Sequence, residues 1–231
     1  MKAARHNVLY LCLHGVGSPP SGISTDERRY WMTGERFDDL LDFVSKHNQS
    51  STVKLKLSFD DANASDLDVV LPRLLARNMT AHFFVPSSFI GLSDHLDADA
   101  IRRLAEAGMR IGSHGHRHED WRSFDWERLR RDMQQSREEL CDLVGRNINT
   151  IAPPFGHWSA AMVHLAKSVG YEQFFTCNGH AGPAAAFLQH RLVMTCDTGI
   201  SEFRRAVSRP AVAKAHLRNA LAGLAKASHS A

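Results

Sequence analysis

Short runs of apolar residues alternate along the chain with longer segments in which apolar residues recur every three or four positions. The short runs are typical of buried β-strands, and the longer periodicity is typical of amphipathic helices. The predicted strands cover residues 7–13, 53–59, 80–85, 109–113, 149–152, 172–177 and 191–195. The predicted helices cover residues 37–46, 98–107, 126–144 and 159–169.

Glycine and proline positions agree with these boundaries. Gly108, Gly145 and Gly170 each come just after a predicted helix, where a left-handed residue commonly ends it. Pro72 suits the first turn of a further helix, because a proline there loses no helical hydrogen bond. The chain thus alternates strand and helix from its first residues onward.

This alternation predicts an α/β fold built from βαβ units around a parallel sheet. Seven strands in 231 residues fit a closed or nearly closed barrel. The chain shows no internal repeat and no linker. We therefore expect one domain over residues 1–231, with a core at about residues 7–200.

Composition narrows the range of functions. Hydrophobic residues make up 43% of the chain and charged residues 23%, which is typical of a chain that folds around a core. A net charge of +3 is too small to indicate a nucleic-acid-binding protein. The 14 histidines indicate metal binding or acid–base chemistry. The four cysteines form no CxxC pair and predict reduced thiols that are mostly buried.

Two segments bear on where the protein acts. The apolar run at residues 8–13 is too short for a signal peptide core or a membrane helix, so we expect a cytoplasmic protein. Residues 201–226 carry six basic residues and one acid, Glu202. They predict a basic C-terminal helix that either contacts an anionic surface, such as the inner face of a membrane, or packs on the barrel as a solvated final helix.

Two acids follow the predicted strand at residues 53–59, at the end where a parallel barrel carries its reactive groups. Neighbouring residues on an extended chain point in opposite directions. Asp60 and Asp61 would therefore have different roles if both are functional, one binding a metal and the other taking a proton. The alternative is a solvated turn or a helix cap.

Three histidines follow the predicted strand at residues 109–113. His114 and His118 are four residues apart, so a helical turn after the strand would place both on one face. Together with a carboxylate from another strand end they would bind a divalent ion and leave positions open for water and substrate. His116 lies between them and should point elsewhere. The alternative is a polar loop that is rich in histidine.

Three motifs resemble those of a known family, the polysaccharide deacetylases, also called the NodB homology domain or carbohydrate esterase family 4. They are Ser-Phe-Asp-Asp at 58–61, Gly-Ser-His-Gly-His-Arg-His at 112–118 and Pro-Pro-Phe-Gly at 153–156. Their order and spacing also match, and the resemblance covers roughly residues 7–200. It implies a distorted (β/α)7 barrel and metal-dependent hydrolysis of an N-acetyl group on a sugar.

The resemblance also implies roles for single residues. Asp60 is expected to be the general base, and Asp61, His114 and His118 are expected to bind one divalent metal ion. Zinc is the expected ion, with cobalt, manganese, nickel and iron as alternatives. The backbone N–H of Phe155 is expected to stabilise the oxyanion, and the rigid Pro153-Pro154 pair to hold its loop.

The sequence departs from the family pattern at two places. Ala152 stands where the family usually carries an arginine that orients the base, and Arg191 is the expected substitute, with a surface charge as the alternative. The late strand has no histidine where the family has its general acid. The candidates for that role are His190, His14, His157 and His180.

Aromatic residues fall in loops on the proposed active face. Their rings stack well on sugars, so we expect Trp121 and Trp158 to contact substrate together with Pro154, Phe155 and Gly156. Phe124 is a further aromatic residue in these loops. The alternative for each aromatic residue is that it anchors its loop in the core.

These features predict an enzyme that deacetylates N-acetylated hexosamine in a cell-surface polysaccharide, an exopolysaccharide or a lipid-linked precursor. One alternative is a deformylase or small-amide hydrolase that uses the same site on a lipid-linked amino sugar. Another is a carbohydrate-binding homologue without activity, since two motifs are altered. The partner in each case is a carbohydrate and not a nucleic acid.

Overall fold

The computed structural model describes residues 6–198. The predicted basic helix at residues 201–226 lies outside these residues, so its contacts remain a prediction. None of the helices in the described range is both long and apolar enough to cross a membrane.

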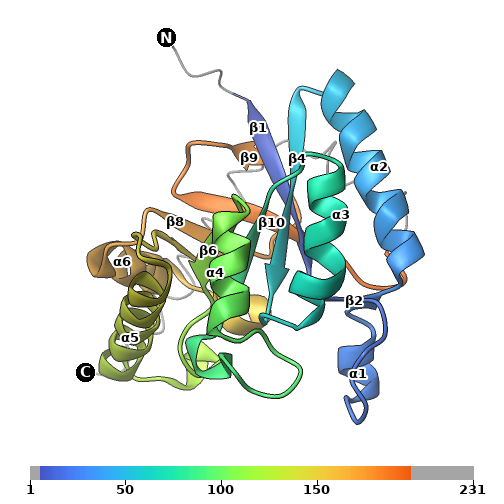
Figure 1. Cartoon of the computed structure of the whole chain (residues 1–231). Helices are drawn as coiled ribbons and strands as arrows, with labels where there is room; N and C mark the ends of the chain where they lie inside the picture. Colours follow the sequence, from blue (N-terminus) through green and yellow to red (C-terminus); the bar gives the residue numbers. More distant parts are fainter. Residues whose placement is uncertain (1–5, 199–231) are drawn as a thin grey trace.

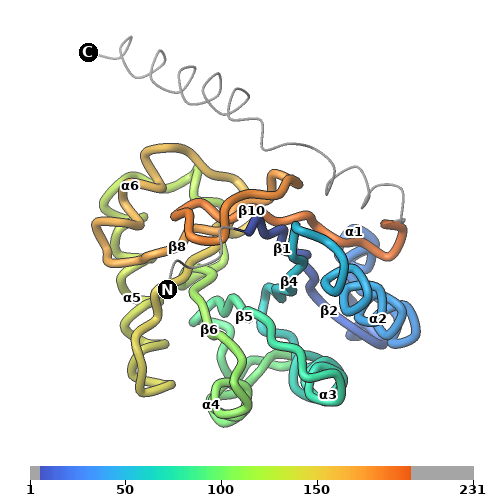
Figure 2. The backbone as a smooth tube through the Cα atoms, turned by 90° about the horizontal axis from the view of Figure 1, so that it is seen from above, coloured from blue at the N-terminus to red at the C-terminus, as the bar shows by residue number. Residues whose placement is uncertain are grey.

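Seven parallel strands form a closed barrel, as predicted (Figure 2). In chain order they are β1 (Asn7–Leu13), β4 (Val53–Asp60), β5 (Ala81–Val85), β6 (Arg110–Ser113), β7 (Thr150–Ile151), β8 (Gln173–Thr176) and β10 (Leu188–Val193). Each pairs with the next, and β10 pairs with β1 to close the ring. The last strand begins at Leu188 and not at Arg191, because the three residues 188–190 also pair with β8.

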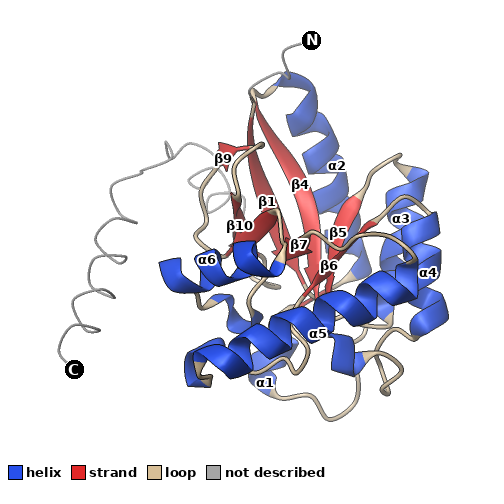
Figure 3. Cartoon of the chain, turned by 90° about the vertical axis from the view of Figure 1, so that its left-hand side faces the viewer, coloured by secondary structure: helices blue, strands red, loops and turns tan. Residues whose placement is uncertain are grey.

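Helices cover the outside of the barrel (Figures 1 and 3). They are α2 (Gly34–Ser50), α3 (Leu71–Ala76), α4 (Ala98–Glu106), α5 (Trp126–Val144) and α6 (Ala160–Val169). Each lies between two consecutive barrel strands. The connection from β8 to β10 carries instead a short strand, β9 (Gly182–Pro183), that pairs antiparallel with β1. This missing helix makes the barrel irregular.

Local sequence signals set several helix ends. Gly145 and Gly170 are left-handed C-caps of α5 and α6, as predicted. Pro72 lies in the first turn of α3, also as predicted, and a turn of π-helix (Asp66–Val70) leads into it. Ser159 caps the start of α6, where its side chain accepts a hydrogen bond from the Met162 N–H.

Alternation along the strands separates two hydrophobic layers. On β1, Leu9, Leu11 and Leu13 belong to the larger layer between barrel and helices. Val8 and Tyr10 belong to the smaller cluster, which also contains Phe84, Ala152 and Phe175. Because successive strand residues point to opposite faces, this smaller cluster fills the barrel interior.

A segment between β1 and α2 was not predicted as ordered structure. It contains β2 (Gly15–Val16), a short helix α1 (Thr25–Arg28) and β3 (Trp31–Met32), with β2 and β3 paired in a two-stranded sheet. A Cβ at position 15 would overlap the Trp31 ring, so only glycine allows this close approach. These pieces are too short for a periodic pattern, which is why the sequence did not reveal them.

Candidate active site

Asp60 and Asp61 point into one site at the carboxyl end of the barrel. Asp60 is the last residue of β4 and is buried. Asp61 has a φ of 76°, so the extended backbone stops and turns between the two residues. Both carboxylates therefore lie 3.6 Å from the same atom, Nε2 of His114. The expectation that they point in opposite directions was wrong, because the strand ends at Asp60.

His114 is held with one nitrogen facing the carboxylates. Its Nδ1–H donates to the carbonyl oxygen of Ala152 at 2.8 Å. A carbonyl can only accept, so the proton is on Nδ1 and the lone pair is on Nε2. Burial lowers the pKa of His114 to about 4, against the opposing effect of Asp60. The ring is therefore neutral near pH 7, the form that binds metals.

His118 reaches the site from a loop and not from a helix. The expected helical turn after β6 is absent from residues 114–120, and His118 itself has a φ of 52°. Its Nε2 lies 3.0 Å from Oδ1 of Asp61, and its ring centre lies 5.1 Å from that of His114. The two histidines thus meet as predicted, although through a different backbone path.

Asp132 on α5 holds this loop in place. Its carboxylate accepts hydrogen bonds from the N–H groups of His116 and Arg117, both at 3.1 Å, and from the indole of Trp121 at 3.3 Å. Asp132 is 6% exposed. No sequence motif includes Asp132, because it lies within α5 and contacts the loop only through the folded backbone.

Asp61, His114 and His118 form a candidate metal centre. One ligand atom of each lies within 4.8 Å of the others. Two imidazole nitrogens and a carboxylate oxygen are a donor set that suits zinc and related divalent ions, with open positions for other ligands. Burial raises the pKa of Asp61, but its contacts with His118, His14 and His114 outweigh this and hold the pKa well below its usual range. The residues present therefore fit a divalent ion.

Arg191 lies beside Asp60, as expected for the substitute of the missing arginine. Its Nη1 donates to Asp60 Oδ1 at 2.5 Å, and its side chain is fully buried. Burial favours the neutral acid, yet Arg191, His114 and His14 lower the pKa of Asp60 below its usual value. Cys12 contacts the other carboxylate oxygen, Oδ2, at 3.3 Å. The surface-charge alternative for Arg191 is wrong.

The four candidates for the general acid lie in different places. One ligand atom each of His14, Cys12 and Asp60 lies within 4.8 Å of the others. His190 lies next to Arg191 on β10, so its side chain points out of the barrel. There it contacts Thr176, and its ring centre lies 3.9 Å from that of His180. His157 pairs with Asp120 at 3.2 Å. His14 is therefore the candidate that the structure brings to Asp60.

Trp121 is a core residue and not a sugar platform. It is 1% exposed and packs in the larger hydrophobic layer. Trp158 is half-buried, packs against the same layer, and donates to Asn178. The prediction that Trp121 contacts substrate was wrong, because the loop turns its ring under α5.

Phe155 remains an exposed aromatic residue at the site. It is 60% exposed, and its ring centre lies 5.1 Å from that of His118. Phe155 and Gly156 both have positive φ, which turns the 153–156 loop sharply. A Cβ on Gly156 would lie 3.0 Å from the Cβ of Cys177, and the φ of 70° at this position favours glycine. Pro154 is buried beneath this turn.

A cleft of about 520 Å³ opens beside the candidate metal ligands. His14, Asp61 and His118 line one side of it, and the unpredicted segment supplies Glu27, Tyr30 and Trp31 on the other. Residues 93–95, from the loop before α4, complete the rim. The site therefore combines the candidate metal ligands with a cleft large enough for a small ligand.

Comparison with known proteins agrees with this architecture. The family model described as Polysaccharide deacetylase matches residues 47–174. In Bacillus subtilis (strain 168), the putative polysaccharide deacetylase YxkH is 22% identical over 120 residues, which is 52% of this chain and 43% of that protein. The peptidoglycan-N-acetylmuramic acid deacetylase PdaA of the same organism is 27% identical over 107 residues, 46% of this chain and 39% of PdaA. The chain thus spans about two-fifths of the length of these relatives.

A solved structure shows the same fold. The Streptococcus pyogenes deacetylase PplD, in complex with acetate, superposes with a TM-score of 0.73 at 17% sequence identity. The match covers 89% of this chain and 100% of that one. The irregular seven-stranded barrel is therefore the barrel of the deacetylase structures, as the sequence motifs implied.

Proposed function

The chain belongs to the polysaccharide deacetylase family, and on that premise we propose that it hydrolyses the N-acetyl group of a hexosamine residue such as N-acetylglucosamine. The observation that carries this proposal is the convergence of Asp60, Asp61, His114 and His118 at one end of the barrel. A proton acceptor and a candidate three-ligand metal centre lie side by side there, and metal-assisted amide hydrolysis uses both.

Asp60 is the general base of the proposed reaction. Arg191 holds Oδ1, so Oδ2 is the oxygen that takes the proton from the attacking water. The buried ion pair keeps the carboxylate ionised and fixes its direction, which a base in a closed barrel requires. Arg191 thus acts through Asp60 and is a positioning residue.

Asp61, His114 and His118 hold the divalent ion, which we propose to be zinc. When bound, the ion supplies polarisation of the acetyl carbonyl and activation of the water nucleophile. The Nδ1–H of His114 on Ala152 and the contacts of Asp132 with the histidine loop keep the ligands oriented.

His14 is the proposed general acid, and the 153–156 loop the proposed oxyanion site. His14 lies near Asp60 in the wall of the cleft and can deliver a proton to the leaving amine of the sugar. The backbone N–H of Phe155 is the proposed donor to the oxyanion, and the exposed Phe155 ring can stack on a sugar.

The substrate that fits best is a hexosamine in a cell-surface polysaccharide, an exopolysaccharide or its lipid-linked precursor. The cleft opens beside the metal ligands and has an aromatic wall formed by Tyr30 and Trp31. We propose that the protein acts on such glycans from the cytoplasmic side. The four intact site residues favour an enzyme over a binding protein without activity.

Acetate release tests the proposal. The purified chain is loaded with Zn²⁺ and incubated with N-acetylglucosamine oligomers and, in parallel, with their N-formyl analogues. Acetate release that stops on chelation and falls by about 10²–10⁴-fold in Asp60→Asn supports deacetylation. Formate release without acetate release would replace it by deformylation, and equal, metal-independent rates in wild type and variant would refute both.

A further inference from the structure

A second cavity lies at the opposite mouth of the barrel, where the strands begin. It has a volume of about 340 Å³. Its lining includes Lys54 and Lys56 from β4, His82 from β5 and Arg110 from β6, each early in its strand. All barrel strands are parallel, so this mouth is opposite the one with Asp60. Figure 1 shows the beginnings of β1 and β4, and so this mouth of the barrel, at the top of the view.

The cavity is strongly cationic. Lys54, Lys56 and Arg110 are cationic side chains, His6 and His82 add ring nitrogens, and none of the described lining residues is acidic. Lys54 donates to the carbonyl of Asn48, and Lys56 lies over the Tyr10 ring at 5.7 Å. Within residues 6–198, no ion pair reaches Lys56 or Arg110. Three like charges around one cavity repel one another, and a bound anion would remove that cost.

His82 supplies a buried polar atom without a partner. It is 4% exposed, and its Nε2 has no hydrogen-bond partner. A buried ring nitrogen without a partner costs free energy, which hydrogen bonding to a ligand would recover. Burial lowers the pKa of His82 to about 3, with Arg110 and Lys56 adding to the effect, as expected beside uncompensated cations.

We propose that this basal cavity binds the phosphoryl group of a phosphorylated ligand. Three cationic side chains match a di- or trianion such as a phosphate monoester or a diphosphate better than a singly charged carboxylate. The site is separate from the catalytic end, since the interior layer of Tyr10, Phe84 and Phe175 lies between them. Binding at this site does not depend on the proposed deacetylase activity.

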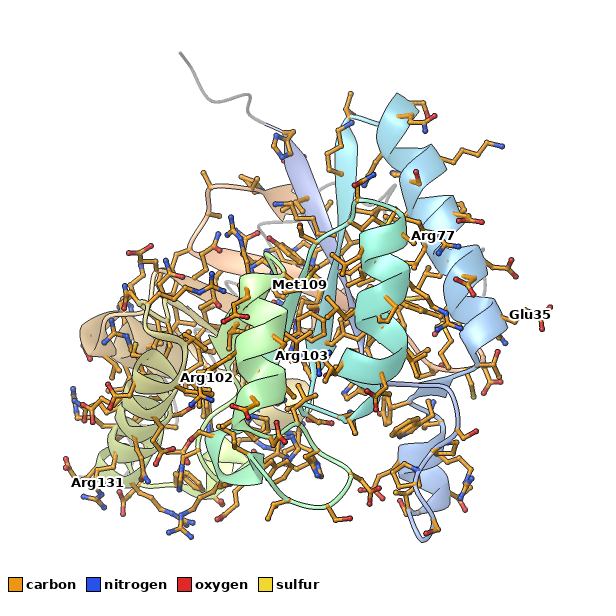
Figure 4. The ribbon with its side chains drawn as sticks, in the orientation of Figure 1. Glu35, Arg77, Arg102, Arg103, Met109 and Arg131 are labelled. Atoms are coloured by element: carbon orange, nitrogen blue, oxygen red, sulfur yellow. The ribbon has the colours of Figure 1, made fainter. Side chains whose placement is uncertain are left out.

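Calorimetric titration with sodium diphosphate tests the site on the full chain, in a buffer free of other polyvalent anions. We expect saturable binding of one diphosphate, with acetate binding far more weakly. The double variant Lys56→Gln/Arg110→Gln should weaken diphosphate binding by about tenfold or more. The matched control Arg103→Gln/Arg131→Gln removes the same charge from the outer faces of α4 and α5 (Figure 4) and should bind like wild type.

A second readout locates the ligand. The imidazole NMR signals of His82 should move on addition of diphosphate, while those of the exposed His164 should not. Equal loss of binding in both double variants, or binding no tighter than acetate, would overturn the site. Thermal melting of each variant separates loss of binding from loss of folding.

Vesicles distinguish the two sources of a phosphoryl group. Phosphatidylcholine vesicles with and without phosphatidic acid are mixed with the chain and sedimented. Binding that needs phosphatidic acid, competes with diphosphate and is lost in Lys56→Gln/Arg110→Gln supports a lipid headgroup. Diphosphate binding without vesicle binding supports a soluble phosphorylated ligand.

Discussion

Arg191 and Asp60 form an ion pair inside the barrel, with Nη1 and Oδ1 2.5 Å apart and the two side chains 0% and 4% exposed. The residues are separated by 131 positions in the sequence. Closure of the barrel brings them together, because β10 pairs with β1 and β1 pairs with β4. This contact is the one expected if Arg191 substitutes for the arginine that the resemblance led us to expect at the position of Ala152.

The pair predicts a distinct result for two substitutions. Arg191→Gln leaves Asp60 buried without its cation, which should destabilise the fold by about 3–5 kcal/mol and raise the pKa of the base. Arg191→Lys keeps the charge but loses the planar geometry, so it should fold better and still lower kcat. Denaturant unfolding and the pH profile of kcat measure the two effects. Wild-type kcat in Arg191→Gln would contradict the assignment.

Substitutions of His14 and His190 test which histidine is the proton donor. His14→Gln should lower kcat by about 10²–10⁴-fold, because the proposed acid near Asp60 is lost. His190→Gln changes a ring that points out of the barrel and should leave kcat within about twofold, within the spread of surface substitutions. Steady-state measurement of kcat for both variants on the same oligomer distinguishes the two candidates. A larger loss of kcat in His190→Gln than in His14→Gln would contradict the assignment of His14 as the general acid.

Asp132 should control metal binding without touching the metal ligands. Asp132→Asn keeps the shape but weakens the contacts to the His116 and Arg117 N–H groups, so His118 is held less firmly. We expect a loss of zinc affinity of about 10–100-fold, as for other partners of metal ligands. Competition with a chelator measures it. The exposed Asp142→Asn on the same helix is the control and should leave the affinity unchanged.

We expect Trp121 to contribute to the stability of the fold and Phe155 to contribute to substrate binding. Trp121→Ala removes a fully buried ring and should cost about 3–5 kcal/mol of unfolding free energy. Phe155→Ala removes an exposed ring, so stability should change by less than about 0.5 kcal/mol while KM for the oligomer rises. Chemical denaturation and kinetics separate the two. An unchanged unfolding midpoint in Trp121→Ala would contradict its place in the core.

His82 predicts a pH dependence of stability. Its pKa is about 3 in the folded chain and about 6.5 when unfolded, so only the unfolded chain takes up this proton between those values. The stability from the neutral ring is complete above pH 6.5 and is lost as pH falls toward 3. Between pH 7 and pH 4, the free energy of unfolding of His82→Phe should therefore fall by about 1–3 kcal/mol less than that of wild type.

Urea unfolding at a series of pH values, in buffers without phosphate, measures this difference. His164→Gln, an exposed histidine on α6, is the control and should follow wild type. Parallel stability curves for wild type and His82→Phe would show that His82 is not held neutral.

Hydrophobic periodicity along the chain by itself predicts most of the architecture. Strand and helix positions depend on local alternation, and the glycine caps at Gly145 and Gly170 depend on backbone freedom at one residue, so both are visible in the sequence. The motifs also selected Asp60, Asp61, His114 and His118. The segment with β2, α1 and β3 escaped, since its elements are too short to show a period.

The tertiary structure alone decided how these residues meet. The turn at Asp61 brings both carboxylates to His114, and barrel closure places Arg191 on Asp60. The strand direction at β10 sends His190 outward, and packing under α5 buries Trp121. The contacts of Asp61 with His114 and of Arg191 with Asp60 join residues far apart in the chain. Such contacts leave no local pattern, so the sequence determined which residues carry the chemistry and the fold determined which of them touch.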